Sequence, residues 1–110
     1  MKKFALLSVS DRTGLSNLAA ALSRAGYTLL ATSGTGKALD EAQIPWTSVE
    51  SYTGLAELLD GRVKTLHPKI HAGILARRDQ KHHLEQMAAA EIGQIDIVVV
   101  NLYPFIKYLD

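Results

Sequence analysis

Short apolar runs alternate along the chain with longer segments in which apolar residues recur at helical spacing. The apolar runs, each predicted to be a strand, are residues 4–9, 27–31, 46–49 and 95–100. Because strands that alternate with helices form parallel sheets, the pattern predicts an α/β fold with an open, mainly parallel sheet flanked by helices. The run 95–100 is apolar and rich in β-branched residues, so we expect it in the centre of the sheet.

Five further segments carry the helical pattern. They are residues 15–22, 37–42, 54–59, 68–76 and 80–92. Gly26 is the expected stop of the first helix, since glycine readily adopts the left-handed conformation that ends many helices. Thr35 is the expected N-cap of the second helix. Pro68 suits the first position of the fourth helix, where its missing N–H and fixed φ are tolerated.

The composition predicts one globular domain over residues 1–110, with 47% apolar and 21% charged residues. The net charge of +1 offers no overall field for a nucleic acid or an anionic membrane, so no such partner is expected. The absence of cysteine excludes a disulfide framework and a thiolate metal site. The first apolar run is too short for a signal peptide, and no run could span a bilayer. We therefore expect a cytoplasmic protein.

The segment 60–68 concentrates cations and hydrogen-bonding groups behind an Asp-Gly turn. Its chemistry-bearing residues are Arg62, Lys64, Thr65 and His67. Arg62 and Lys64 flank Val63, so they point the same way in extended backbone. A cationic loop that leads into a helix can hold an anion, because free N–H groups and the helix dipole add to the side-chain charge. The segment predicts a phosphorylated or carboxylated small-molecule ligand, and the alternative is a solvated charged loop.

Three polar loops follow predicted strands, at residues 8–12, 32–35 and 101–103. The carboxyl ends of parallel strands share one edge of a sheet, where ligands bind, so we expect the loops to converge there. The first could instead cap a helix through Ser10 or Asp11, and the second could be a plain turn with a capping threonine. Tyr103 could pack in the core or orient a substrate.

The histidines are better explained by structure than by metal binding. His67 and His71 have the spacing of metal ligands on a helix, but no third ligand is near, so capping or packing is favoured and no metal site is predicted. The adjacent His82 and His83 are expected on a solvated helix surface.

Taken together, these segments resemble the N-terminal inosine monophosphate (IMP) cyclohydrolase portion of the bifunctional purine biosynthesis enzyme, which joins the cyclohydrolase to a formyltransferase. The resembling stretches are residues 8–15, 32–35, 52–54, 60–68, 70–75 and 100–105, of which the Arg-Val-Lys-Thr-Leu-His-Pro string at 62–68 is the most specific. The resemblance implies a methylglyoxal-synthase-like fold. It also implies closure of the purine ring of the formamido-imidazole-carboxamide ribonucleotide, with loss of water and without cofactor or metal.

The resemblance further implies roles for individual residues. The positions implied to bind the phosphate are Ser10, Arg12, Ser33, Gly34 and Thr35, with Ser8 and Thr32 in the same site. The positions implied to contact the base and the reacting groups are Arg62, Val63, Thr65, Asn101 and Leu102. Lys64 is the first catalytic candidate and Tyr103 the second, because either could transfer protons or stabilise a developing oxyanion.

The chain departs from the family pattern in two ways. The family often has lysine in place of Arg12 and a Gly-Gly pair in place of Ser33-Gly34; both changes still allow phosphate binding. The family also continues beyond Asp110 with an Asp-Ile-Gly-Gly and an Ala-Ala-Lys-Asn segment that serve the active site. We therefore expect a truncated chain that is weakly active or inactive alone, with an exposed sheet edge that favours self-association.

Two other readings stay open from the sequence. One is a non-catalytic nucleotide-binding domain, similar to the regulatory domain of carbamoyl phosphate synthetase. The other is a lyase similar to methylglyoxal synthase, which acts on a phosphorylated triose. For the full-length enzyme the resemblance implies a homodimer.

Overall fold

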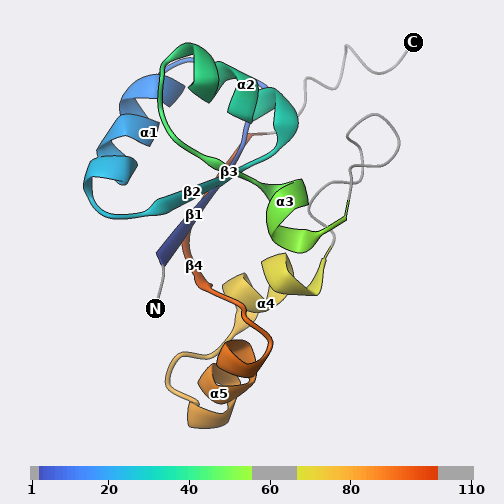
Figure 1. The fold of residues 1–110 in the computed structure, drawn as a ribbon. Helices are drawn as coiled ribbons and strands as arrows, with labels where there is room; N and C mark the ends of the chain where they lie inside the picture. Colours follow the sequence, from blue (N-terminus) through green and yellow to red (C-terminus); the bar gives the residue numbers. More distant parts are fainter. Residues whose placement is uncertain (1–2, 56–66, 102–110) are drawn as a thin grey trace.

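The computed structural model describes residues 3–55 and 67–101, which form a four-stranded sheet with helices around it (Figure 1). The elements in chain order are β1 (Lys3–Ser8), α1 (Leu15–Arg24), β2 (Thr28–Ala31), α2 (Ser33–Glu41), β3 (Thr47–Ser48), α3 (Val49–Thr53), α4 (Pro68–Leu75), α5 (Lys81–Ala89) and β4 (Gln94–Val100). The strand order is β3-β2-β1-β4 and every neighbouring pair is parallel. The predicted parallel α/β fold is confirmed.

Strand β1 lies between two hydrophobic clusters. Ala5 and Leu7 belong to the cluster that packs against α1 and α2. Phe4 and Leu6 point to the other face, where they pack with residues of α3 and α4. This alternation follows from the two-residue period of a strand, and burial on both faces explains why β1 is almost continuously apolar. In Figure 1, α5 lies at the far end of the molecule from α1 and α2.

Three helices end in the same hydrogen-bonded turn, in which the residue after the C-cap has a positive φ. These residues are Gly26 after α1 (φ 95°), Gln43 after α2 (φ 58°) and Glu91 after α5 (φ 58°). The closing bonds run from Tyr27 N to Leu22 O (3.1 Å), Ile44 N to Leu39 O (2.9 Å) and Ile92 N to Met87 O (2.8 Å). This is the Schellman pattern, and it confirms Gly26 as a helix stop.

Several predicted helix boundaries are wrong. Helix α2 begins at Ser33 behind Thr32, so Thr35 lies inside the helix and is not its N-cap. Of the predicted helix 54–59, the structure describes residues 54 and 55, which lie outside any helix, because α3 covers residues 49–53 and ends where Gly54 adopts φ 78°. The reason is local: Ser48 caps α3 by accepting a hydrogen bond from Ser51 N over 2.9 Å, which also shortens the third strand to two residues. Helix α5 is shorter than 80–92 because Glu91 turns the chain.

Strand β4 lies at an edge of the described sheet, which contradicts its predicted central place. Helix α4 packs on the start of one β4 face through Ile70 and Ile95. Farther along the same face, Val98 and Val100 are 44% and 62% exposed. The apolar composition of β4 follows from packing on both faces, because Ile95 packs with α4 and Ile97 and Val99 pack against the cluster of α1 and α2. A hydrophobic run cannot by itself distinguish such an edge strand from a central one.

Among the helices of residues 3–55 and 67–101, none has the length and apolarity needed to cross a membrane.

Candidate functional site

The carboxyl ends of β1, β2 and β4 meet at one edge of the sheet. Ser8 ends β1 and pairs with Val100 of β4, while Leu7 pairs with Ala31 of β2. The loops that follow these strands therefore start side by side, as the sequence predicted. Thr32 donates a hydrogen bond from Oγ1 to Ser8 Oγ over 3.3 Å, which joins the β2 loop directly to the end of β1.

Asn101 ties the end of β4 to the loop after β1. Its Oδ1 accepts hydrogen bonds from Ser10 N (2.7 Å), Ser10 Oγ (2.8 Å) and Asp11 N (3.3 Å). Its Nδ2 donates to Asp11 O over 2.9 Å. Residues 90 positions apart in the sequence are thus joined by one side chain. The predicted convergence of the first and third polar loops is confirmed.

Thr35 holds the same loop from the α2 side. Its side chain is buried, with 1% of the residue exposed. Thr35 Oγ1 accepts a hydrogen bond from Val9 N over 3.0 Å and donates one to Val9 O over 3.3 Å. Thr32 is also buried and its Oγ1 lies 3.4 Å from Thr35 Oγ1. What Thr35 can offer a ligand is therefore its backbone N–H, because its hydroxyl is engaged inside the protein.

Arg12 lies against the N-terminal turn of α2. A Cβ built on Gly34 would lie 2.8 Å from Arg12 Nη2, so glycine is what allows the guanidinium to come this close. The N–H groups of a first helical turn lack intrahelical partners and carry the positive end of the helix dipole. A guanidinium beside such a turn can bind an anionic group such as phosphate with charge-assisted hydrogen bonds.

The structure brings the residues predicted for the phosphate to this one edge, where Asn101, predicted for the base side, joins them. The predicted phosphate residues are Ser8, Ser10, Arg12, Thr32, Ser33, Gly34 and Thr35. Arg12 and Ser33 are exposed to solvent and within reach of a ligand, whereas Thr32 and Thr35 are buried. The arrangement is suited to one phosphate group at the edge of the sheet.

Neither Ser10 nor Asp11 caps α1, contrary to the alternative that the sequence left open. The N-cap of α1 is Gly14, at φ 75° and without a side-chain cap. Asp11 Oδ1 instead accepts a hydrogen bond from Thr13 N over 3.0 Å. The backbone and side-chain hydrogen bonds from Thr13 hold the pKa of Asp11 below its ordinary value of 3.8. The Asp11 carboxylate thus binds the backbone of its own loop and does not cap α1.

The remaining predicted site residues lie outside the described residues. They are Arg62, Val63, Lys64, Thr65, Leu102 and Tyr103. The roles given to them by resemblance, including the catalytic roles of Lys64 and Tyr103, stay predictions.

The histidines have structural partners. His67 is the N-cap of α4, and its Nδ1 accepts a hydrogen bond from Lys69 N over 3.1 Å, which confirms capping. His83 was predicted on a solvated surface, but it is half-buried and its Nδ1 accepts a hydrogen bond from Arg77 N over 3.0 Å. The described residues contain no cluster of three side chains with metal-ligand chemistry.

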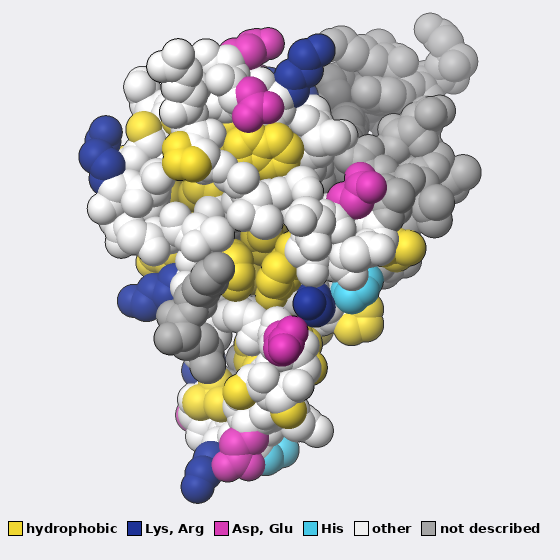
Figure 2. All heavy atoms as spheres, viewed as in Figure 1, with side chains coloured by type: hydrophobic (Ala, Val, Ile, Leu, Met, Phe, Trp, Pro, Cys, Tyr) yellow, Lys and Arg dark blue, Asp and Glu magenta, His cyan; other side chains and the backbone are white. Residues whose placement is uncertain are grey.

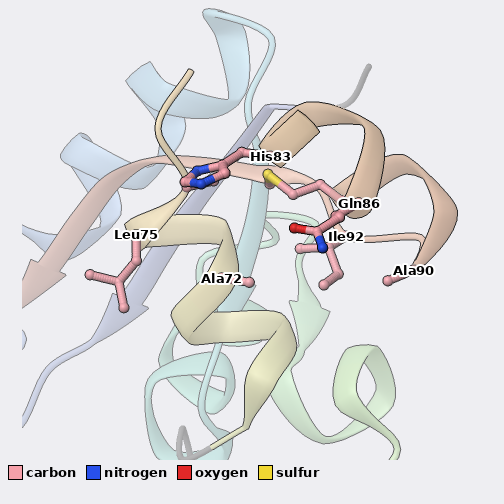
Figure 3. A pocket seen from close by; sticks show the side chains of 8 residues that line it. Ala72, Leu75, His83, Gln86, Ala90 and Ile92 are labelled. Carbon is pink, nitrogen blue, oxygen red and sulfur yellow. The ribbon is translucent and has the colours of Figure 1, made fainter. Parts of the chain in front are cut away.

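A cavity of about 350 Å³ lies between α4 and α5 (Figure 3). Leu75, Met87 and Ile92 line it together with His83, and its wall is mainly apolar. No lysine or arginine lines it, and it is separate from the edge that carries Arg12.

Sequence reasoning missed two features of the site. The first is that the side chains of Thr32 and Thr35 point into the protein. Residues three apart share a helix face, so the spacing of these threonines at a helix start could have indicated it. The second is the close approach of Arg12 to Gly34, which sequence spacing does not reveal.

The fold and this edge define a class: small parallel α/β domains whose polar loops gather at the carboxyl ends of their strands. Within that class, the family model described as "MGS-like domain" matches residues 14–108. The chain belongs to the MGS-like domain family. The methylglyoxal-synthase-like fold expected from the resemblance is confirmed.

Two relatives extend the comparison. The chain is 59% identical over 105 residues to the "Bifunctional purine biosynthesis protein PurH" of Lactiplantibacillus plantarum, a match that covers 96% of this chain and 21% of the relative. The chain therefore spans about a fifth of the length of that protein. A solved structure described as "Crystal structure of ForH" matches with a TM-score of 0.83 and 39% identity, over 94% of this chain and 54% of the other.

Proposed function

We propose that this domain serves purine biosynthesis as part of an IMP cyclohydrolase. The observation that carries the proposal is the joint edge formed by Arg12, Gly34 and Asn101, which suits the phosphate of a ribonucleotide. The 59% identity to a bifunctional purine biosynthesis protein supports the same substrate class. The substrate would be 5-formamidoimidazole-4-carboxamide ribonucleotide.

The proposed reaction closes a six-membered ring within one molecule. The carboxamide nitrogen attacks the formyl carbon, a new C–N bond forms, and the formyl oxygen leaves as water. Both reacting groups are attached to the same imidazole ring, so holding the ribonucleotide by its phosphate serves to place that ring against the catalytic groups. This is the part of catalysis that the described edge can supply.

The charge that develops on the formyl oxygen needs a cation or a hydrogen-bond donor. By resemblance we assign this role to Lys64, with Arg62 and Thr65 near the reacting groups, and we assign a second proton-transfer role to Tyr103. No cofactor or metal is part of the proposal.

The test is absorbance-monitored cyclisation of the formamido ribonucleotide, with nucleotide binding measured in parallel. In the full-length protein we expect turnover above the uncatalysed rate, with weak turnover at most from residues 1–110 alone, and we expect Lys64→Ala to lose turnover while it keeps binding. Lys37→Ala, at an exposed position of α2, is the matched control and should leave both unchanged. Unchanged turnover in Lys64→Ala would contradict the role assigned to Lys64.

Two outcomes would favour the other readings. Nucleotide binding without turnover, in this chain and equally in the full-length protein, would identify a non-catalytic regulatory domain. Conversion of a phosphorylated triose without cyclisation would identify a lyase of the methylglyoxal synthase type. Absence of any binding to phosphorylated ligands would contradict all three.

We also propose that the domain pairs with a second copy in the full-length enzyme and acts in the cytoplasm. The exposed Val98 and Val100 on β4 support an association surface. The absence of cysteine is compatible with a reducing compartment. Sedimentation equilibrium and cell fractionation are the checks, and a monomer at all concentrations would contradict the pairing.

A further inference from the structure

Asn101 reaches the site from β4, and its amide is engaged with the protein itself. Oδ1 accepts from Ser10 N, Ser10 Oγ and Asp11 N, and Nδ2 donates to Asp11 O. An amide oxygen has two lone pairs and an amide nitrogen two hydrogens. Oδ1 is therefore fully occupied, and one Nδ2 hydrogen at most is left for a ligand.

The direction of this amide is fixed by its partners. Backbone N–H groups of Ser10 and Asp11 can only donate, and Asp11 O can only accept. If the oxygen and nitrogen of the Asn101 amide were exchanged, the amide NH2 would face the N–H groups of Ser10 and Asp11, which are also donors. The amide oxygen would then face Asp11 O, which is also an acceptor. The network thus assigns the orientation on chemical grounds.

Asn101 also occupies the hydroxyl of Ser10. That hydroxyl carries a single hydrogen, which it donates to Asn101 Oδ1 over 2.8 Å. A phosphate dianion only accepts hydrogen bonds, so Ser10 Oγ cannot serve it while it serves Asn101. In this loop Arg12 is the cationic group, and its Nη2 approaches Gly34 at the start of α2.

The loop is held at successive residues from two sides. Thr35 binds both Val9 N and Val9 O from α2. Asn101 binds Ser10 and Asp11 from β4. Arg12 comes next in the chain, so its backbone starts from a fixed point. A loop that is ordered during folding costs no ordering entropy when a ligand arrives.

We propose that Asn101 is a positioning residue: it fixes the loop 9–12 so that Arg12 stands over the N-terminus of α2, and it acts on the phosphate through Arg12 instead of contacting the base. The proposal rests on the proposed function for the identity of the ligand. It departs from the resemblance, which placed Asn101 on the base side of the substrate.

The test compares two probes that share a phosphate and differ in the base. Ribose 5-phosphate has no base and IMP has one. We expect Asn101→Ala to weaken both by the same factor, about tenfold, because a lost preorganising contact of ordinary strength has this effect. A loss confined to IMP would overturn the proposal, because it would mean that Asn101 contacts the base.

Two further variants keep the comparison sharp. Asn101→Asp keeps the acceptor for Ser10 and Asp11 but loses the donor to Asp11 O and adds a negative charge, so it too should weaken both probes equally. It applies even where Asn101→Ala is too unstable to study. Asn17→Ala, at an exposed position of α1, is the matched control and should change neither affinity.

Amide hydrogen exchange tests the positioning role without any ligand. In Asn101→Ala the N–H groups of Ser10 and Asp11 should exchange about tenfold faster than in the unmodified chain, and in Asn101→Asp they should stay protected. Unchanged exchange in Asn101→Ala would overturn the role. Should the unmodified chain bind neither probe, the proposed function fails while the exchange result still decides the positioning role.

Discussion

The α1–α2 side of the sheet and the α4–α5 segment (residues 68–89) differ in how they are packed. On the first side, Leu7 of β1 and Leu39 of α2 are fully buried in one continuous cluster. In the second, Met87 is the buried residue of α5, and Leu75 at the end of α4 is 72% exposed. A cavity of about 350 Å³ lies between the two helices of the second region. Figure 2 shows charged side chains of both signs on the surface of the α4–α5 segment.

The difference has a functional consequence, because the candidate site is built on the densely packed side. Thr35 and Gly34 belong to α2, and Thr35 positions Val9 at the end of β1. Densely packed elements hold side chains to the tolerance that a binding site needs. The α4–α5 segment contributes none of the described site residues, so its looser packing does not disturb the edge that would bind phosphate.

The largest expected effect is the contrast between two leucines. Leu39→Ala should lower the free energy of unfolding by about 3 kcal/mol, because it leaves a cavity in a filled core. Leu75→Ala removes the same atoms from an exposed position and should change it by less than about 0.5 kcal/mol. Urea denaturation followed by circular dichroism measures both. Equal costs would contradict the packing difference.

A smaller effect is expected from Gly36→Ala in the packed region. A Cβ at this position would overlap the ring of Trp46. The ring is also held by a hydrogen bond from Trp46 Nε1 to Asp40 Oδ1 over 2.7 Å, so it has little freedom to move. We expect a loss of about 2 kcal/mol, net of the better helix propensity of alanine.

A double-mutant cycle with Trp46→Leu identifies the cause of that loss. In the Trp46→Leu background the alanine meets a smaller, flexible side chain, so its cost should fall or change sign. A cost that is the same in both backgrounds would mean that Trp46 is not the source.

The sheet and the meeting of the polar loops were predictable because they depend on short-range patterns. The β1 run is apolar since both its faces are buried, and each polar loop directly follows a strand, so a parallel sheet brings them together. The phosphate role proposed for Arg12 came from resemblance, and the structure adds the close approach of Arg12 to Gly34.

The predictions that were wrong concern features that depend on tertiary contacts or on single capping residues. The place of β4 at the edge depends on which strands pair beside it, and in the described sheet its partner is β1. An apolar run does not encode that pairing. The start of α2 moved because Thr32 is the N-cap in place of Thr35. The turns that close α2 and α5 contain Gln43 and Glu91, which adopt a positive φ without being glycine. The usual glycine stop signal is therefore absent from the sequence at these two helix ends.

The next effect concerns the attachment of the α4–α5 segment to β4. Arg78 pairs through Nη1 with Asp96 and donates from Nη2 to Ile95 O over 3.0 Å. These contacts fall where the β1–β4 register shifts, between Phe4 and Ala5. We expect Arg78→Ala to cost about 1 kcal/mol and to speed amide exchange within residues 68–89.

Arg77→Ala is the control for that change. The pair between Arg77 and Asp79 joins two side chains that are 64% and 70% exposed, so its loss should have almost no effect on stability. Comparable effects of the two substitutions would mean that Arg78 does not anchor the segment.

The smallest expected effect is a pH dependence on the site edge. Hydrogen bonds from Thr13 lower the pKa of Asp11 below 3.8, so the folded state favours the charged carboxylate more than the unfolded chain does. The stabilisation is therefore complete above 3.8 and is lost as the pH falls through the lower pKa of the folded state. Asp11→Asn keeps an acceptor for Thr13 N but removes the charge. The unfolding free energy of this variant should differ slightly from that of the unmodified chain at neutral pH, and the two values should converge in acid. A difference that grows as the pH falls would contradict the lowered pKa of Asp11. Because the carboxylate is exposed, the effect stays well below that of Leu39→Ala, which is what a site edge resting on a packed core should show.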